Sequence, residues 1–277
     1  MIPFDFEYYR PDTIQEATDI FQQLESEGKT PVYYSGGSEL ISMARVGNLT
    51  FRAVIDIKNI PECKVLEYDQ ENNLILGSAL TLSEISESKQ FPLLEKTAGR
   101  IADHTMQCKI TLGGNLASTI IYRETVLPLL LADSRAVVAS QDGLREYPIS
   151  QIFDRRLNLN KGCLLVKIIT NKGFIESPYF HIKKTKNEKI DYPLLTTAGL
   201  KAGGLLRIAF SGLFSYPFRS VQIENILNDT VSFEERTEKI ADIVSGNILS
   251  DINGSSEYRK YVLKNTIMNV LETMKDA

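Results

Sequence analysis

The chain has 277 residues, with 31 Lys and Arg against 35 Asp and Glu, so its formal net charge is −4. A broad basic surface for nucleic acid is therefore not expected. Apolar residues make up 43% and charged residues 24%, as in ordinary globular proteins, and the length suggests about two or three domains.

The cysteines and histidines are few and scattered. Cys63, Cys108 and Cys163 lack a C-x-x-C spacing, and His104 lies far from His181. Protein-bound zinc and iron–sulfur clusters need closely spaced ligands, so we expect no metal site held by this chain alone. Three unpaired thiols favour a reducing, cytoplasmic compartment. No apolar run is long enough to cross a membrane, and the N-terminus lacks the pattern of a signal peptide.

Helix and strand signals alternate irregularly along the first 170 residues. Two T-x-x-E capping patterns, at Thr13 and Thr81, predict helix starts. The other helices are expected over residues 39–46, 93–106 and 118–132, and strands over 31–34, 53–57, 63–68, 73–79, 136–140, 144–148 and 163–170. Strands 63–68 and 73–79 are expected to form one hairpin, and strands 136–140 and 144–148 a second one across the turn signal Asp142-Gly143. This irregular mixture predicts an α+β fold rather than a doubly wound sheet.

The pattern changes near residue 172, where we predict a domain boundary. Three antiparallel strands are expected over 179–185, 194–202 and 205–213, followed by helices over 221–227, 233–246 and 256–274. A small antiparallel sheet covered by helices is therefore predicted for the C-terminal part.

Two short glycine pairs are the main candidates for a binding site. Ser35-Gly36-Gly37-Ser38-Glu39 lies between a predicted strand and a helix, and Thr111-Leu112-Gly113-Gly114-Asn115 joins two predicted helices. Backbone N–H groups at such positions can approach an anion closely, so the two loops together could hold a pyrophosphate. Each loop taken alone is also explained as a tight turn, and neither is a P-loop or a G-x-G-x-x-G fingerprint.

Other candidates for chemistry are weaker. His104 has no visible partner, and Cys108 is followed by Lys109, which could lower the pKa of its thiol. The basic run at residues 183–189 is explained as a solvated hairpin end. No Ser/His/Asp or Cys/His pattern is present, so no catalytic residue is predicted.

The order of several short motifs resembles the FAD-binding medium subunit of molybdenum hydroxylases, a family that includes xanthine, carbon monoxide and nicotinate dehydrogenases. The motifs are Tyr9-Arg10-Pro11, Ser35 to Leu40, Val54 to Ile57, Ile75 to Thr81, Thr111 to Ala117, Pro128 to Ala132, Gly143 to Ile149 and Ser256 to Lys260. They span essentially the whole chain.

The resemblance implies a vanillyl-alcohol-oxidase-like (PCMH-type) FAD-binding fold with subdomains 1–55 and 56–172, and a C-terminal domain 173–277. It implies that both glycine loops grip the FAD pyrophosphate. The cofactor-binding residues that it implies are Ser35, Gly36, Gly37, Ser38, Glu39, Thr111, Leu112, Gly113, Gly114, Asn115, Glu124, Ile168, Lys183 and Asp191. Gln107, Cys108 and Asn187 depart from the family pattern, Ser35 and Glu39 replace commoner residues in the first loop, and Glu124 stands where the family usually has Asp.

The resemblance also implies an electron-transfer role. Electrons would leave an organic substrate on a molybdopterin-binding large subunit, pass through a [2Fe–2S] small subunit to FAD, and reach NAD. A purine such as xanthine is the leading substrate, with CO, nicotinate or an aromatic thioester as alternatives. Two readings from other classes remain: a flavin-less assembly subunit, and an FAD-linked oxidase that works alone.

Overall fold

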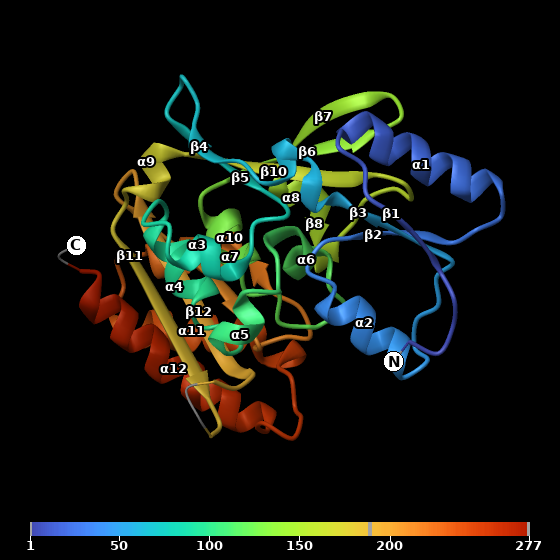
Figure 1. The fold of residues 1–277 in the computed structure, drawn as a ribbon. Coiled ribbons are helices and arrows are strands. Elements are labelled where there is room, and N and C mark those ends of the chain that lie inside the picture. The colour runs from blue at the N-terminus through green and yellow to red at the C-terminus, as the bar shows by residue number, and fades with distance from the viewer. Residues whose placement is uncertain (1, 188–189, 276–277) are drawn as a thin grey trace.

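The computed structural model describes residues 2–187 and 190–275 and arranges them around three larger sheets and one two-stranded ladder (Figure 1). In this described part, a three-stranded parallel sheet comes first, a five-stranded antiparallel sheet second and a four-stranded antiparallel sheet third. Glu188 and Lys189 of the predicted basic run lie outside the described residues. The combination of helices with separate antiparallel sheets confirms the predicted α+β class.

The parallel sheet carries the first glycine loop at one end. Its strands, in spatial order, are β1 (Glu7–Tyr9), β3 (Ala53–Asp56) and β2 (Pro31–Tyr34). The connecting helices are α1 (Ile14–Ser26) and α2 (Ser38–Arg45). Thr13 caps α1 by accepting the N–H of Glu16, as its capping pattern predicts. The first glycine loop follows the carboxyl end of β2 and leads directly into α2.

The antiparallel five-stranded sheet is centred on β10 (Leu164–Asn171). The other strands are β4 (Leu66–Tyr68), β5 (Asn73–Gly77), β6 (Arg135–Ser140) and β7 (Gly143–Pro148). β10 pairs with β5 on one side and with β6 on the other. Both hairpins predicted from the sequence, β4–β5 and β6–β7, are present.

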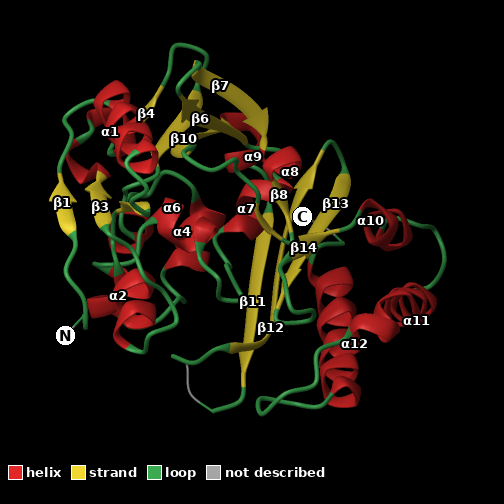
Figure 2. Ribbon diagram, turned by 90° about the vertical axis from the view of Figure 1, so that its right-hand side faces the viewer, coloured by secondary structure: helices red, strands yellow, loops and turns green. Residues whose placement is uncertain are grey.

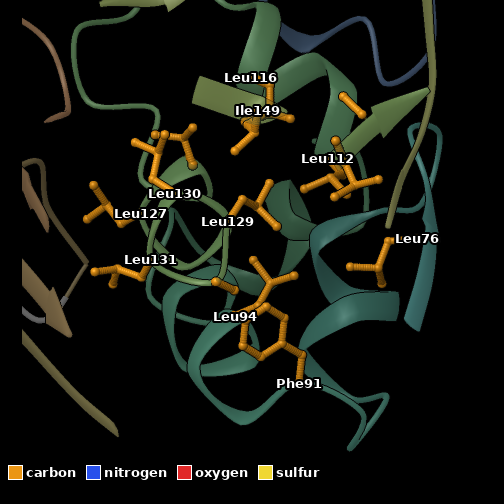
Figure 3. Packing of buried hydrophobic residues seen from close by; sticks show 14 of the residues in the cluster. Leu76, Phe91, Leu94, Leu112, Leu116, Leu127, Leu129, Leu130, Leu131 and Ile149 are labelled. Atoms are coloured by element: carbon orange, nitrogen blue, oxygen red, sulfur yellow. The ribbon is translucent and has the colours of Figure 1, made fainter. Parts of the chain in front are cut away.

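Short helices cover this sheet and enclose the largest apolar cluster. They are α3 (Leu82–Ser86), α4 (Pro92–Ala98), α5 (His104–Gln107), α6 (Leu112–Ala117), α7 (Val126–Leu131), α8 (Ile149–Ile152) and α9 (Lys172–Ile175), with the short ladder β8 (Phe153–Asp154) and β9 (Arg156–Leu157) beside them. Figure 3 shows Phe91, Leu94, Leu112 and Leu129 in this cluster. Burial of such side chains is the main stabilising contribution to the helix positions.

Two predicted helices are shorter than expected. The helix predicted over 93–106 ends at Ala98, and Ala102 adopts a left-handed φ of 54° before α5 begins. The helix predicted over 118–132 begins only at Val126, because Arg123 has a positive φ of 32°. Positive φ values interrupt a right-handed helix, and neither residue type signals one in the sequence.

The C-terminal part places a sheet between two groups of helices. The strands are β11 (Tyr179–Thr185), β12 (Pro193–Ala202), β13 (Leu205–Ser211) and β14 (Phe218–Arg219), and the helices are α10 (Val221–Leu227), α11 (Phe233–Val244) and α12 (Ser256–Thr273). Figure 2 shows α10, α11 and α12 on one side of this sheet and α4 and α7 toward the other. The sheet is therefore a shared wall that connects the C-terminal helices with the flanking helices of the second sheet.

Candidate functional site

A cavity of about 790 Å³ brings the two glycine loops together, and its size lies within the usual range for small-molecule sites. Its wall also includes parts of residues 101–124 and 157–165 and the end of the β11–β12 hairpin. The predicted site residues that line it are Ser35, Gly36, Gly37, Ser38, Glu39, Thr111, Gly113, Gly114, Asn115, Glu124, Lys183 and Asp191.

The two loops touch through their backbones. A Cβ atom added at Gly36 would overlap the carbonyl oxygen of Lys109, just before the second loop. A residue with a side chain would therefore push the two loops apart. Glu39 adds a second link between the walls, since its carboxylate accepts the N–H of Thr119 at 2.7 Å.

The first loop presents an unfilled helix N-terminus to the cavity. Gly37 is the N-cap of α2, with a left-handed φ of 71°, and it provides no side-chain cap. The first-turn N–H groups of an α-helix have no partner within the helix, and they favour an anion. The Oγ atom of Ser35 is buried beside them with no hydrogen-bond partner in the structure. These unused donors fit a phosphate group.

The second loop differs, because its N–H groups are already bonded within the protein. Gly113 donates to the carbonyl of Ser78 at 2.8 Å, and Gly114 donates to Oγ1 of Thr111 at 3.2 Å. The Oδ1 atom of Asn115 accepts the hydroxyl of Thr125 at 2.6 Å. The second loop therefore gives the cavity its shape, while the first loop holds the donors that remain available.

Leu112 and Ile168 are predicted site residues that do not line the cavity. Leu112 is fully buried in the apolar cluster that Figure 3 shows. Ile168 is also fully buried, within β10, where it pairs with Leu76 and Ala136. The β10 residues that reach the cavity are Leu164 and Leu165.

A buried ion pair closes another part of the cavity. Lys183 Nζ lies 2.9 Å from Glu124 Oε2, and the two side chains are 1% and 4% exposed. Thr196 donates to the other carboxylate oxygen of Glu124 at 2.6 Å, and Lys183 also donates to the carbonyl of Arg100 at 2.7 Å. These hydrogen bonds satisfy both charges, which burial would otherwise destabilise. Glu124 and Lys183, which were predicted as separate site residues, thus form one ion pair in the structure.

Asp191 lies on the rim and not in this ion pair. Its carboxylate accepts hydrogen bonds from the side chain of Asn187 at 3.2 Å and from the N–H of Tyr192 at 2.7 Å. The ring of Tyr192 stacks on Tyr122 with centroids 5.0 Å apart, and both rings line the cavity. This aromatic pair gives one end of the cavity a flat apolar wall.

Sequence reasoning missed Arg123. It lines this cavity and a smaller polar one beside it, and it is 5% exposed. Its guanidinium donates to the carbonyls of Ser118 and Arg155, and burial lowers its pKa. The adjacent Glu124 was found only through the family resemblance, and no local pattern marks Arg123 itself.

Gln107 and Cys108, two of the residues that depart from the family pattern, make their contacts outside the cavity wall. Gln107 is buried and donates to the carbonyls of Ile101 and Ala102, so it holds the turn between α4 and α5. Cys108 is exposed, and its Sγ atom lies 3.8 Å from Nε2 of His104. Neither residue lines the cavity.

A family comparison identifies the cofactor of this chain. Residues 4–170 match the family described as the FAD binding domain in molybdopterin dehydrogenase. The chain belongs to this family. FAD is therefore its cofactor, as the sequence resemblance predicts, and the unused donors at α2 are consistent with a cofactor that carries a pyrophosphate.

Relatives support the family assignment along the chain. The glyceraldehyde dehydrogenase medium chain of Sulfolobus acidocaldarius is 25% identical and aligns with 95% of this chain and 96% of its own length. The xanthine dehydrogenase FAD-binding subunit of Escherichia coli O157:H7 is 25% identical, but it aligns with 53% of this chain and 51% of its own length. The structure of carbon monoxide dehydrogenase from Hydrogenophaga pseudoflava has the same fold, with a TM-score of 0.85, 22% identity and 98% of both chains covered.

Among residues 2–187 and 190–275, no helix is long and apolar enough to cross a membrane. The same residues contain no group of three or more His, Cys, Asp or Glu side chains placed to hold a metal ion.

Proposed function

We propose that the cavity holds FAD with its pyrophosphate at the N-terminus of α2. The observation that carries this proposal is the uncapped first turn of α2, together with the unpartnered Ser35 Oγ beside it. Backbone N–H groups would stabilise the two negative charges, and the positive end of the helix dipole adds to this effect.

The other predicted residues would then have separate tasks. Thr111, Gly113, Gly114 and Asn115 shape the pyrophosphate site, and Leu164 and Leu165 form an apolar wall where Ile168 was expected. The pair of Glu124 and Lys183 would face the flavin half of the cofactor, with Asp191 on the rim. We retain the PCMH-type division into residues 1–55, 56–172 and 173–277 as part of this proposal.

The chain would serve as an electron-transfer subunit of a molybdenum hydroxylase. FAD, when bound, supplies the ability to exchange electrons singly with an iron–sulfur centre and in pairs with an acceptor such as NAD. The protein's own residues bind and orient the cofactor. The proposed partners are a molybdopterin-binding large subunit and a [2Fe–2S] small subunit. The cytoplasm is the proposed location, since the three cysteines are free.

A purine such as xanthine remains the first substrate to test for the assembled enzyme. Relatives named for glyceraldehyde and for xanthine are both 25% identical to this chain over their aligned parts, which are 95% and 53% of it. This equality fits a subunit that does not itself select the substrate. We therefore assign substrate choice to the large subunit.

A flavin-less assembly subunit is the competing proposal, and the structure gives it little support. The departures from the family pattern at Gln107, Cys108 and Asn187 would favour it, but none of the three residues lines the cavity. The residues found at these three positions do not alter the first glycine loop or its unused donors.

Titration of the apoprotein tests where the cofactor lies. FAD, riboflavin and ADP are each titrated, and binding is followed by flavin fluorescence or by competition. FAD is expected to bind more tightly than riboflavin, and ADP to compete with FAD, because both carry the pyrophosphate. Equal affinity for FAD and riboflavin would contradict a phosphate site at α2.

A further inference from the structure

Lys58 lies beneath the first glycine loop and makes three contacts there. Its Nζ atom donates to the carbonyl oxygen of Ser35 at 3.1 Å and to Oδ2 of Asp56 at 2.7 Å. The same ammonium group lies 4.3 Å from the ring centroid of Tyr34, within the range of a cation–π interaction. One cation thus connects β3, the end of β2 and the start of the loop.

Asp56 fixes the position of this ammonium group. Asp56 is 3% exposed, and its carboxylate also accepts hydrogen bonds from the Tyr8 hydroxyl at 2.5 Å and from the backbone N–H of Lys58 at 3.0 Å. Burial by itself would raise the pKa of Asp56, but the hydrogen bonds from Lys58 and Tyr8 outweigh it and lower the pKa. The carboxylate is therefore charged near neutral pH and holds Lys58 in place.

Tyr34 transmits this arrangement to the loop. A Cβ atom added at Gly37 would overlap the Tyr34 ring, so the ring packs directly on the backbone of the residue that caps α2. Ser35 and Gly37 are therefore both linked to Lys58, one by a hydrogen bond and the other through the aromatic ring that contacts its ammonium group.

We propose that Lys58 is a positioning residue for the phosphate-binding loop, a role that rests on the proposed function. It does not line the cavity. It holds the Ser35 carbonyl turned away from the cofactor, so that the N–H groups of Gly37 and α2 point into the cavity. Its loss would weaken the grip on the pyrophosphate and leave the flavin half of the site unchanged.

The test compares FAD with riboflavin in matched variants of the full chain. Lys58→Met is expected to weaken FAD binding by about tenfold or more, because a charge-assisted hydrogen bond and a cation–π contact are lost together. Riboflavin affinity should stay the same, and Lys58→Arg should restore most of the FAD affinity. Lys64→Met is the control, since Lys64 forms an exposed ion pair with Glu84 and neither residue lines the cavity.

Each outcome has a distinct meaning. Unchanged FAD affinity in Lys58→Met, or equal losses for FAD and riboflavin, would overturn the positioning role while the proposed function stands. Failure of the wild-type chain to bind FAD would overturn the proposed function and this role together. If Lys58→Met does not fold, Lys58→Gln removes the charge with a smaller change in polarity, and the same comparison applies.

Discussion

At the scale of single residues, Gly36 leaves no room for a side chain, since an added Cβ atom would overlap the backbone of Lys109. Gly36→Ala should weaken FAD binding about tenfold or more, because overpacking strain of about 1–3 kcal/mol would separate the loops. Gly246→Ala is the matched control, since a Cβ atom there would meet nothing within 4 Å. FAD titration of both variants makes the measurement, and equal affinities would show that the loop contact is not required.

His181 provides a second prediction at this scale. Burial lowers the pKa of His181 from 6.5 to about 4, and the nearby charges of Arg100, Lys183 and Lys96 act in the same direction. Below pH 6.5 the unfolded chain therefore protonates this histidine, whereas the folded chain keeps it neutral. The free energy of unfolding should decrease as the pH is lowered from 6.5 to about 4. The pKa of Asp56 is lowered from 3.8, so its effect lies below this window, whereas the pKa values of Glu7 and Glu84 are lowered from 4.5 and their effect overlaps its acidic end.

Urea unfolding across this pH range measures the effect. His181→Gln should flatten the pH dependence, because glutamine does not titrate. The same slope in the variant and the wild type would show that other groups cause the loss of stability.

At the scale of elements, the pair of Glu124 and Lys183 joins β11 to the segment before α7. Lys183→Met alone should destabilise the apoprotein by about 3–5 kcal/mol, since it leaves a buried carboxylate without its cation. The double variant Glu124→Gln with Lys183→Met should be less destabilised than the single one. Denaturant unfolding of the apoprotein measures both, and an additive double variant would contradict the coupling.

Short sequence motifs correctly predicted those helix starts and turns that depend only on residues close in sequence. The caps at Thr13 and Thr81 and the turn before Gly143 mark their elements correctly, because the interactions that set them are short in sequence. The break after Ala98 was not predicted, because it depends on Gln107 bonding back to the carbonyls of Ile101 and Ala102. A hydrogen bond from a side chain to a nearby carbonyl does not change the apolar periodicity from which helices are predicted.

At the scale of the whole molecule, the site is assembled from segments far apart in sequence. The glycine loops were predicted as partners from their residues and from the family resemblance, and the close approach of Gly36 to Lys109 places them side by side. Which loop keeps free donors was not predictable, because the bond from Gly113 to Ser78 depends on the packing of α6 against the end of β5. The position of Arg123 likewise follows from tertiary structure.

The proposed partners give a prediction at the same scale. The chain purified from its native cells should carry two further subunits, and the complex should contain molybdenum and iron. Xanthine, CO and glyceraldehyde are then supplied anaerobically, and one of them should bleach the flavin in the complex but not in the isolated chain. Bleaching of the isolated chain would favour an oxidase that works alone.

The central claim is that this chain binds FAD in the cavity between its two glycine loops. The most direct measurement is the visible absorption spectrum of the purified chain after incubation with FAD and removal of free flavin. A spectrum with the two bands of oxidised flavin, at one FAD per chain, is expected for the wild type, with a clear loss in Gly36→Ala. A colourless wild-type chain, or full retention of flavin in the variant, would contradict it.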